Sequence, residues 1–263
     1  MRIKLFQLEA VNQKEHNLRK ILQFLDNSDC DLNVFPEYIM GVNDRFLTRE
    51  YVKRIAEPIN GDFVSSILEK SREKGVAVVF TMFLKEDGKI YNAAIFANKG
   101  KILSIYKKIH LFDAFGYKES SIFTPGIKPT IVSYKGCRIG LAVCFDLRFP
   151  ELFRFMRLKG ANMFIVPSAW YKGKYKLLQW FSLIQSRAHE NGCYTIAVNQ
   201  VGKFFTGHSL IASPLGYIVV DLGEEEKEFS VELDLNEVEE ARKNFRLGYL
   251  WKGHLYREWF EEL

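Results

Sequence analysis

The chain has 263 residues, of which 48% are hydrophobic and 14% aromatic, enough for a large core and too apolar for a disordered protein. Its 37 lysines and arginines exceed its 32 aspartates and glutamates by five, and the excess is spread along the chain. That pattern excludes a basic arm for nucleic acid. The longest apolar runs are far shorter than the roughly 20 residues that cross a bilayer. We therefore expect a folded protein with no nucleic-acid partner and no membrane-spanning segment.

The first residues and the cysteines indicate the compartment. Residues 1–8 alternate polar and apolar side chains and lack the apolar segment and cleavage site of a signal peptide. The four cysteines, Cys30, Cys137, Cys144 and Cys193, form no CxxC pair and have no zinc-site spacing. The sequence thus predicts a cytoplasmic protein without a disulfide framework or a metal site, in which one cysteine matters for its own reactivity.

In the first half of the chain, apolar periodicity predicts alternating strands and helices. Leu18, Ile21, Leu22 and Leu25 follow one another at helical spacing. Asn98-Lys99-Gly100 has the turn chemistry of a β-hairpin. The predicted strands are Ile3–Leu8, Leu32–Phe35, Val76–Phe83, Ile90–Ala97 and Lys101–Ile109, with helices around 18–25 and 63–74 and an irregular stretch over 36–61.

The second half begins with a long loop from His110 to Pro129, and long loops in compact domains are usually functional. After it we expect strands at Thr130–Tyr134, Arg138–Cys144, Ala161–Val166, Cys193–Gln200, Ser209–Ala212, Tyr217–Asp221 and Glu228–Leu233, and helices at Pro150–Leu158 and Leu177–Glu190. No repeat or linker divides the chain. The mixture of hairpins and strand–helix alternation predicts one domain over residues 1–263 with a layered α/β arrangement and mixed sheets.

The last residues, 244–263, carry more aromatic surface than a free tail would. Their large apolar side chains are Phe245, Tyr249, Leu250, Trp251, Leu255, Tyr256, Trp259 and Phe260. We expect this C-terminal segment to dock on the body of the protein or on a partner subunit, where it would serve dimerisation.

Three predicted strands end in reactive side chains. Cys144 lies between a strand and a helix, where the helix N-terminus favours a thiolate. Glu37 follows the second strand, and Lys107 and Lys108 close the strand before the long loop. Each feature alone is more often a buried cysteine, a loop acid or a solvated lysine pair. Together, a carboxylate, an ammonium and a thiol are what amide hydrolysis by a cysteine nucleophile requires.

These three segments resemble the catalytic motifs of the nitrilase superfamily, the carbon–nitrogen hydrolases. They read Phe35-Pro36-Glu37, Tyr106-Lys107-Lys108-Ile109-His110-Leu111 and Cys144-Phe145-Asp146-Leu147-Arg148-Phe149-Pro150-Glu151. The likeness continues to Gly207-His208-Ser209 and Pro214-Leu215-Gly216, and so covers nearly the whole chain. It implies a four-layer α-β-β-α sandwich with two mixed β-sheets, and subunits that pair as a homodimer or a higher homo-oligomer.

The resemblance also implies roles for single residues. Cys144 would be the nucleophile, Glu37 the general base and Lys108 the charge stabiliser, while Glu119 would position the substrate and assist proton transfers. The backbone N–H of Phe145 would share the oxyanion with Lys108, and Trp170 and Tyr171 would line the pocket. Lys107 remains the alternative to Lys108, because strand alternation alone does not tell which of two neighbours faces inward. No cofactor is implied.

Other polar residues near the motifs receive structural interpretations. We expect His110 to be a structural histidine, and Asp146 and Arg148 to form a local ion pair or an anchor at the helix start. Lys172 or Lys174, in the loop after Trp170, would meet a substrate carboxylate or remain a solvated lysine.

The segment from His110 to Gly126 resembles the Nit-type amidase branch, which includes ω-amidases. The implied activity is release of ammonia from a small amide through a thioester on the cysteine. Within the superfamily, a deaminated-glutathione-type amidase, a nitrilase and an N-carbamoyl amidohydrolase remain alternatives. A non-catalytic binding protein with the same fold is the alternative outside catalysis.

Overall fold

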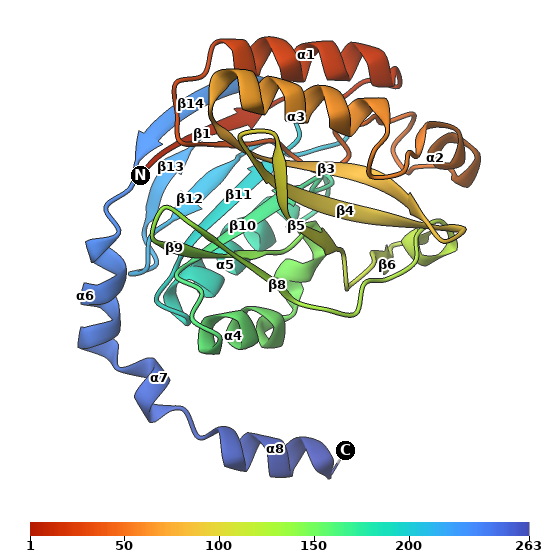
Figure 1. Cartoon of the computed structure of the whole chain (residues 1–263). Helices are drawn as coiled ribbons and strands as arrows, with labels where there is room; N and C mark the ends of the chain where they lie inside the picture. Colours follow the sequence, from red (N-terminus) through yellow and green to blue (C-terminus); the bar gives the residue numbers. More distant parts are fainter. Residues whose placement is uncertain (263) are drawn as a thin grey trace.

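Two six-stranded sheets lie face to face at the centre of the computed structural model, which describes residues 1–262 (Figure 1). The first sheet has the order β14-β1-β2-β3-β4-β5 and the second β13-β12-β11-β10-β9-β8. The strands of the first sheet are β1 (Arg2–Gln7), β2 (Leu32–Val34), β3 (Ala77–Glu86), β4 (Lys89–Asn98), β5 (Lys101–Lys107) and β14 (Lys227–Glu232). Those of the second are β8 (Thr130–Tyr134), β9 (Cys137–Leu141), β10 (Met163–Ser168), β11 (Tyr194–Asn199), β12 (Leu210–Ala212) and β13 (Ile218–Asp221).

Both sheets are mixed because the chain uses two kinds of connection. In the first sheet β1, β2 and β3 are parallel and are joined through α1 (Lys14–Asp26) and α3 (Asp62–Lys74), whereas β3, β4 and β5 are antiparallel and joined by hairpins. In the second sheet β9, β10 and β11 are parallel, with α4 (Pro150–Leu158) and α5 (Lys176–His189) between them. Parallel neighbours require such crossovers, which place helices over the outer faces.

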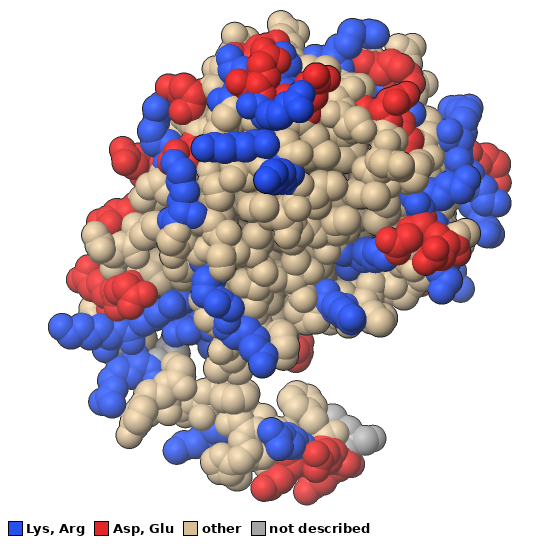
Figure 2. Space-filling model, in the orientation of Figure 1, with Lys and Arg blue, Asp and Glu red and all other residues tan. Residues whose placement is uncertain are grey.

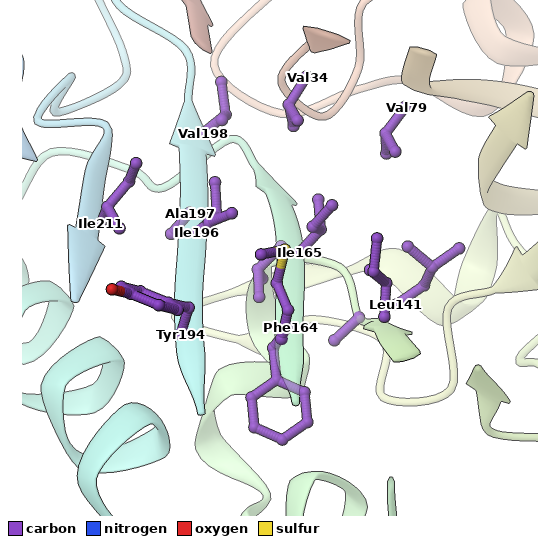
Figure 3. Close-up of a cluster of buried hydrophobic side chains, with 14 of the residues drawn as sticks. Val34, Val79, Leu141, Phe164, Ile165, Tyr194, Ile196, Ala197, Val198 and Ile211 are labelled. Atoms are coloured by element: carbon purple, nitrogen blue, oxygen red, sulfur yellow. The ribbon is translucent and has the colours of Figure 1, made fainter. Parts of the chain in front are cut away.

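The layers follow the order helices, sheet, sheet, helices. Figure 1 shows α1 and α3 over one face of the first sheet, and α4 and α5 over the far face of the second. Between the sheets, Val34 and Val79 point toward Leu141 and Ile165 (Figure 3). The expected four-layer α-β-β-α sandwich is therefore confirmed.

The predicted hairpin at Asn98-Lys99-Gly100 is present between β4 and β5. Asn98 pairs with Lys101, and the two residues between them, Lys99 and Gly100, have φ of 48° and 80°. Both lie in the left-handed region that a tight two-residue hairpin turn requires. The register of β5, and hence the position where its end delivers Lys108, follows from this turn together with a bulge, since Ala97 pairs with Ile102 but Phe96 with Ser104.

The prediction of an irregular stretch over 36–61 was wrong in part. A short helix, α2 (Arg49–Ile55), lies within it, and the Thr48 side chain caps its N-terminus by accepting a hydrogen bond from the Tyr51 N–H. Its buried face has only Tyr51, Val52 and Ile55, too few apolar positions for the periodicity to stand out.

The long loop after β5 is also more ordered than expected. It contains a small hairpin, β6 (Asp113–Ala114) and β7 (Tyr117–Lys118), followed by a 3-10 turn, η1 (Glu119–Ser121). Phe115 and Gly116 form the hairpin turn with φ of 54° and 79°. The turn carries Glu119 into the interior of the protein, where it is fully buried.

After β14 the chain forms α6 (Asn236–Phe245), α7 (Leu247–Leu250) and α8 (Gly253–Glu261). Figure 1 shows α8 beyond the edge of the sandwich, and Figure 2 shows uncharged side chains on this projecting part beside both acidic and basic ones. Three aromatic side chains of this segment, Trp251, Tyr256 and Phe260, line a cavity of about 390 Å³ together with residues of α4. Tyr249 and Trp259 remain 76% and 56% exposed. The C-terminal segment thus touches its own body but leaves much of its aromatic surface open.

In residues 1–262, no helix is both long enough and apolar enough to cross a membrane. The four cysteines are buried and unpaired.

Candidate active site

The carboxyl ends of three strands deliver reactive side chains to one place between the sheets. Glu37 follows β2, Lys108 follows β5, and Cys144 follows β9. The two sheets are linked at this point, because the Glu37 N–H donates to the Ser168 carbonyl at the end of β10 over 3.2 Å. The ends of β2 and β10, which belong to different sheets, therefore meet at the site.

The predicted strand Arg138–Cys144 is shorter than expected, and Cys144 lies on a sharp turn after it. β9 ends at Leu141, and Cys144 opens the 3-10 turn η2 (Cys144–Arg148) with φ of 47°. For a residue with a side chain this left-handed conformation costs about 1 to 3 kcal/mol, so the surroundings must hold it. Asp146 does so by accepting the Val143 N–H over 2.8 Å. The turn projects the Cys144 side chain into the interior, where the residue is 8% exposed.

Lys108 forms the centre of a buried charge cluster. Its ammonium lies 2.9 Å from Glu37 Oε1, and 3.1 and 2.9 Å from Glu119 Oε1 and Oε2. Its backbone is also held, since its N–H donates to the Asn92 carbonyl and its carbonyl accepts the Gly126 N–H, each over 2.8 Å. Lys108 is 1% exposed, so these carboxylates are what keeps a buried ammonium charged.

Lys107 points the opposite way, as strand alternation requires. Its ammonium pairs with Glu86 at the surface and lies 4.1 Å from the centre of the Tyr91 ring. Of the two adjacent lysines, only Lys108 reaches the cluster.

Two residues that the sequence analysis did not single out complete the cluster. Asn92, on β4, donates its amide to Glu37 Oε1 over 2.7 Å and to Glu119 Oε1 over 3.1 Å. The Tyr38 hydroxyl donates to Glu119 Oε1 over 3.0 Å. The signal available for Asn92 was its position as the polar residue in the otherwise apolar run from Ile90 to Ala97. Because the amide bridges both carboxylates, it fixes their spacing around Lys108.

The second oxygen of Glu37 is held by the other sheet. Oε2 accepts the Ala169 N–H over 2.9 Å, and the side chain is 1% exposed. Burial, and the neighbouring Glu119 carboxylate, raise the pKa of Glu37 against the opposing effect of Lys108. A carboxylate with a raised pKa is a stronger base than one in water.

The same surroundings keep the ammonium charged and the thiol protonated, so the expectation that the helix N-terminus favours a thiolate at Cys144 was wrong. Burial raises the pKa of Cys144 well above 9.0, and the negative charge of Glu37 adds to the effect. Although burial opposes it, the pKa of Lys108 is raised well above 10.5 by Glu119 and Glu37. The cluster therefore holds a neutral thiol, a base beside it and a permanent positive charge.

A narrow pocket opens onto this cluster. Its cavity of about 10 Å³ has room for roughly one water molecule. Six of the seven predicted site residues line it: Glu37, Lys108, Cys144, Phe145, Trp170 and Tyr171. Glu119 lies behind Lys108, outside the lining.

His110 and Asp146 form contacts that hold the turn η2 in place. Asp146 accepts hydrogen bonds from the Tyr106 hydroxyl over 2.7 Å, the His110 N–H over 3.0 Å and, at 2.7 Å, pairs with the His110 ring. The imidazole stacks on Phe149 at 3.6 Å between ring centres. The interpretation of Asp146 as a helix-start anchor agrees with these contacts. The alternative ion pair with Arg148 was wrong: the Arg148 guanidinium instead donates to Gln179 over 2.7 Å.

The lysines predicted near a substrate carboxylate lie elsewhere. Lys172 donates to the Gly202 carbonyl over 2.9 Å, and Lys174 lies 4.9 Å from the ring of its neighbour Tyr175, both at the exposed surface. Lys176 and Arg148 line the pocket in their place. The reason is local: Tyr175 adopts φ of 62°, and helix α5 begins at the next residue, so Lys176 turns inward.

Lys176 is 8% exposed and its ammonium lies among rings rather than carboxylates. It is 4.1 Å from the centre of the Phe115 ring, 5.3 Å from Phe112 and 5.5 Å from Trp170. Such cation–π contacts contribute about 0.5 to 2 kcal/mol each, whereas removing an ammonium from water costs several kcal/mol. Burial and the nearby Arg148 lower the pKa of Lys176.

Among residues 1–262, no group of three or more histidine, cysteine, aspartate or glutamate side chains is arranged to hold a metal ion.

The fold and these motifs define a class of protein. Residues 2–243 match the family model of the carbon–nitrogen hydrolases, and the chain belongs to that family. It is therefore a carbon–nitrogen hydrolase with the nitrilase-superfamily fold, as the sequence predicted.

Individual relatives cover almost the whole chain. A protein of Mycobacterium tuberculosis called hydrolase Rv0480c is 33% identical over 92% of this chain and 92% of its own length. An (R)-stereoselective amidase of a Pseudomonas species is 32% identical over 93% of this chain and 89% of its own. The omega-amidase NIT3 of Saccharomyces cerevisiae is 30% identical over 92% of this chain and 90% of its own. The solved structure of yeast Nit3 superimposes with a TM-score of 0.82, covering 94% of each chain at 27% identity.

Proposed function

We propose that the protein hydrolyses a small ω-amide, releasing ammonia through a thioester on Cys144. The observation that carries the proposal is the buried cluster in which Glu37 and Lys108 lie 2.9 Å apart beside the thiol. Two of the relatives are named as amidases, one of them as an omega-amidase, which supports an amide rather than a nitrile as the substrate. Cysteine-dependent amide hydrolysis needs a base, a nucleophile and a positive charge at the oxyanion, and the cluster has all three.

In the first half of the reaction, Glu37 accepts the proton of the Cys144 thiol as its sulfur attacks the amide carbon. The thiol needs this base, because burial keeps its pKa high. Lys108 and the backbone N–H of Phe145, near the start of η2, stabilise the negative charge that develops on the carbonyl oxygen. Glu37 then gives the proton to the leaving nitrogen, so that ammonia departs and an acyl thioester remains.

In the second half, Glu37 takes a proton from a water molecule, which attacks the thioester carbon. The carbon–sulfur bond breaks, the thiolate regains a proton, and the carboxylic acid leaves. Glu119 acts through Lys108 and Asn92, holding the ammonium and the base at a fixed spacing. No step requires a cofactor.

The test is ammonia release from a panel of ω-amides, simple amides, N-carbamoyl amino acids and nitriles. We expect ω-amides such as succinamate to be hydrolysed, and Cys144→Ala to reduce the rate at least about 10⁴-fold. The melting temperature of the variant, measured alongside, distinguishes loss of chemistry from loss of fold. Full activity of folded Cys144→Ala would refute the mechanism, and a preference for nitriles or carbamoyl compounds would refute the substrate class.

We further propose that a second copy of this chain covers the open surface of the C-terminal segment, residues 244–263. The exposed aromatic side chains of α7 and α8 adjoin an apolar cavity on α4, which also exposes Phe155 and Leu158. Glu258 and Glu261 on α8 complement Arg154 and Lys159, on and just after α4. In a two-fold pair, each segment can reach the other copy's α4.

We also propose a cytoplasmic location for the protein, supported by its four unpaired cysteines.

A further inference from the structure

The backbone of Glu37 is held on both sides by the second sheet. Its N–H donates to the Ser168 carbonyl over 3.2 Å, and its carbonyl accepts a hydrogen bond from the side-chain amide of Gln200 over 2.6 Å. Gln200 directly follows β11, and its own N–H donates to the same Ser168 carbonyl over 3.1 Å. All three residues are buried, so water does not compete for these bonds.

The peptide bond that Gln200 holds is a strained one. It joins Glu37 to Tyr38, and Tyr38 has φ of 58°, in the left-handed region. A residue with a large side chain keeps this conformation only where surrounding contacts maintain it. Because a peptide unit moves as a plane, its rotation changes ψ of Glu37 and φ of Tyr38 together. The hydrogen bond from Gln200 to the Glu37 carbonyl opposes that rotation.

The side chains on both sides of this peptide belong to the charge cluster. The Glu37 carboxylate accepts the Ala169 N–H over 2.9 Å and lies 2.9 Å from the Lys108 ammonium. The Tyr38 hydroxyl donates to Glu119 over 3.0 Å. A general base must lie within hydrogen-bond reach of the proton that it takes, so a small displacement of Glu37 is enough to lower the rate.

The other end of the Gln200 amide is tied to the first sheet. Its Oε1 accepts the Ala10 N–H over 3.0 Å, shortly after the end of β1. The amide nitrogen has to face the Glu37 carbonyl and the amide oxygen has to face the Ala10 N–H, so a flipped amide would satisfy neither partner. The orientation of the Gln200 side chain is therefore fixed by both sheets.

We infer that Gln200 is a positioning residue of the reaction: its amide fixes the Glu37–Tyr38 peptide and thereby keeps the Glu37 carboxylate beside Cys144 and Lys108. The inference rests on the proposed function, because it concerns the base of that reaction. Gln200 lies outside the pocket lining, so it acts through Glu37 and not on the substrate.

Gln7, on β1, is the matched control. It is buried as well, and its amide donates to the Gly223 and Glu225 carbonyls over 2.9 and 2.7 Å and accepts the Ser209 N–H over 2.6 Å. Replacing Gln7 thus removes three side-chain hydrogen bonds, whereas replacing Gln200 removes two. If lost stability alone lowered the activity, the Gln7 variant would be affected at least as strongly.

The experiment compares Gln200→Met with Gln7→Met, and Gln200→Asn with Gln7→Asn, beside the wild type. Methionine keeps a similar shape without the amide, and asparagine keeps the amide on a shorter side chain, which decides the question if Gln200→Met does not fold. The melting temperature of each variant is measured with kcat and KM on succinamate.

A second measurement is the rate at which iodoacetamide alkylates Cys144, followed by the mass of the peptide that contains it. In this reaction a bond forms between the sulfur and the methylene carbon, iodide leaves, and the thiol proton goes to Glu37. Alkylation therefore reports on the base without requiring that any amide be hydrolysed.

We expect Gln200→Met to lower kcat roughly 30-fold and to change KM by less than about threefold, because the displaced group is the base and not a substrate contact. Alkylation of Cys144 should slow by a similar factor, and Gln200→Asn should show smaller losses in the same direction. Both Gln7 variants should stay within about threefold of the wild type in both rates, since they leave the position of Glu37 unchanged.

Equal losses of rate in matched Gln200 and Gln7 variants would refute the inference, and so would wild-type rates in folded Gln200 variants. If the wild type does not hydrolyse succinamate, the proposed function fails instead. The alkylation rates of the same proteins then still decide whether Gln200 positions Glu37.

Discussion

The two ends of the pocket treat a buried lysine in opposite ways. At the inner end, Lys108 is surrounded by the carboxylates of Glu37 and Glu119 at 2.9 to 3.1 Å. At the outer end, Lys176 meets only aromatic rings and a second cation. The two carboxylates raise the pKa of Lys108 against the effect of burial, whereas burial, and then Arg148, lower the pKa of Lys176. The comparison teaches that two buried lysines of one pocket differ in their surroundings: the first has carboxylates of the protein around its ammonium, whereas the second has aromatic rings.

The largest effect is expected from removing the charge of Lys108, which lies among carboxylates. We expect Lys108→Met to lower kcat on succinamate by about 10³-fold, because it removes an oxyanion donor and leaves two buried carboxylates uncompensated. The latter effect should also lower the free energy of unfolding by about 3 to 5 kcal/mol. Ammonia release and urea unfolding measure the two effects.

Lys107→Met is the matched control, since it removes the neighbouring charge from the surface pair with Glu86. Exposed pairs contribute about 0 to 1 kcal/mol, so stability and kcat should stay near the wild-type values. Equal losses in the two variants would show that Lys108 has no special role.

The pH dependence of kcat/KM tests the inner end of the pocket, where Glu37 lies beside Lys108. Glu37 must be ionised to accept a proton, and its pKa is raised from 4.5, so activity on succinamate should fall with decreasing pH at values above 4.5.

The smallest effect on catalysis is expected far from both ends of the pocket. A chain ending at Phe245 lacks α7 and α8, whose large side chains are mostly exposed. We expect its kcat/KM to stay within about threefold of the full-length value, and light scattering at micromolar concentration to change from a dimer to a monomer. A full-length chain that is already monomeric would contradict the proposed pairing.

Much of the fold was predictable because each strand carries its own pattern. The buried strands β3 and β10 are apolar runs bounded by turn residues, and the hairpin before Lys101 has a glycine at the required left-handed position. The short helix α2 was missed because three apolar residues do not establish a period. The motif residues Glu37, Lys108 and Cys144 were predicted to act together, and the structure places them in one cluster.

What the sequence by itself determined was the class of protein, and it predicted the candidate reactive groups, since motifs at strand ends are local and keep their order along the chain. Only the tertiary structure decided which neighbours complete those groups. Asn92 bridges two carboxylates because hairpin pairing lays β4 beside β5, and Lys176 rather than Lys172 or Lys174 faces the pocket because α5 begins after a left-handed turn at Tyr175. The sequence shows which side chains are charged. Whether a charged side chain has a partner of opposite charge depends on residues far away in the chain that folding brings beside it.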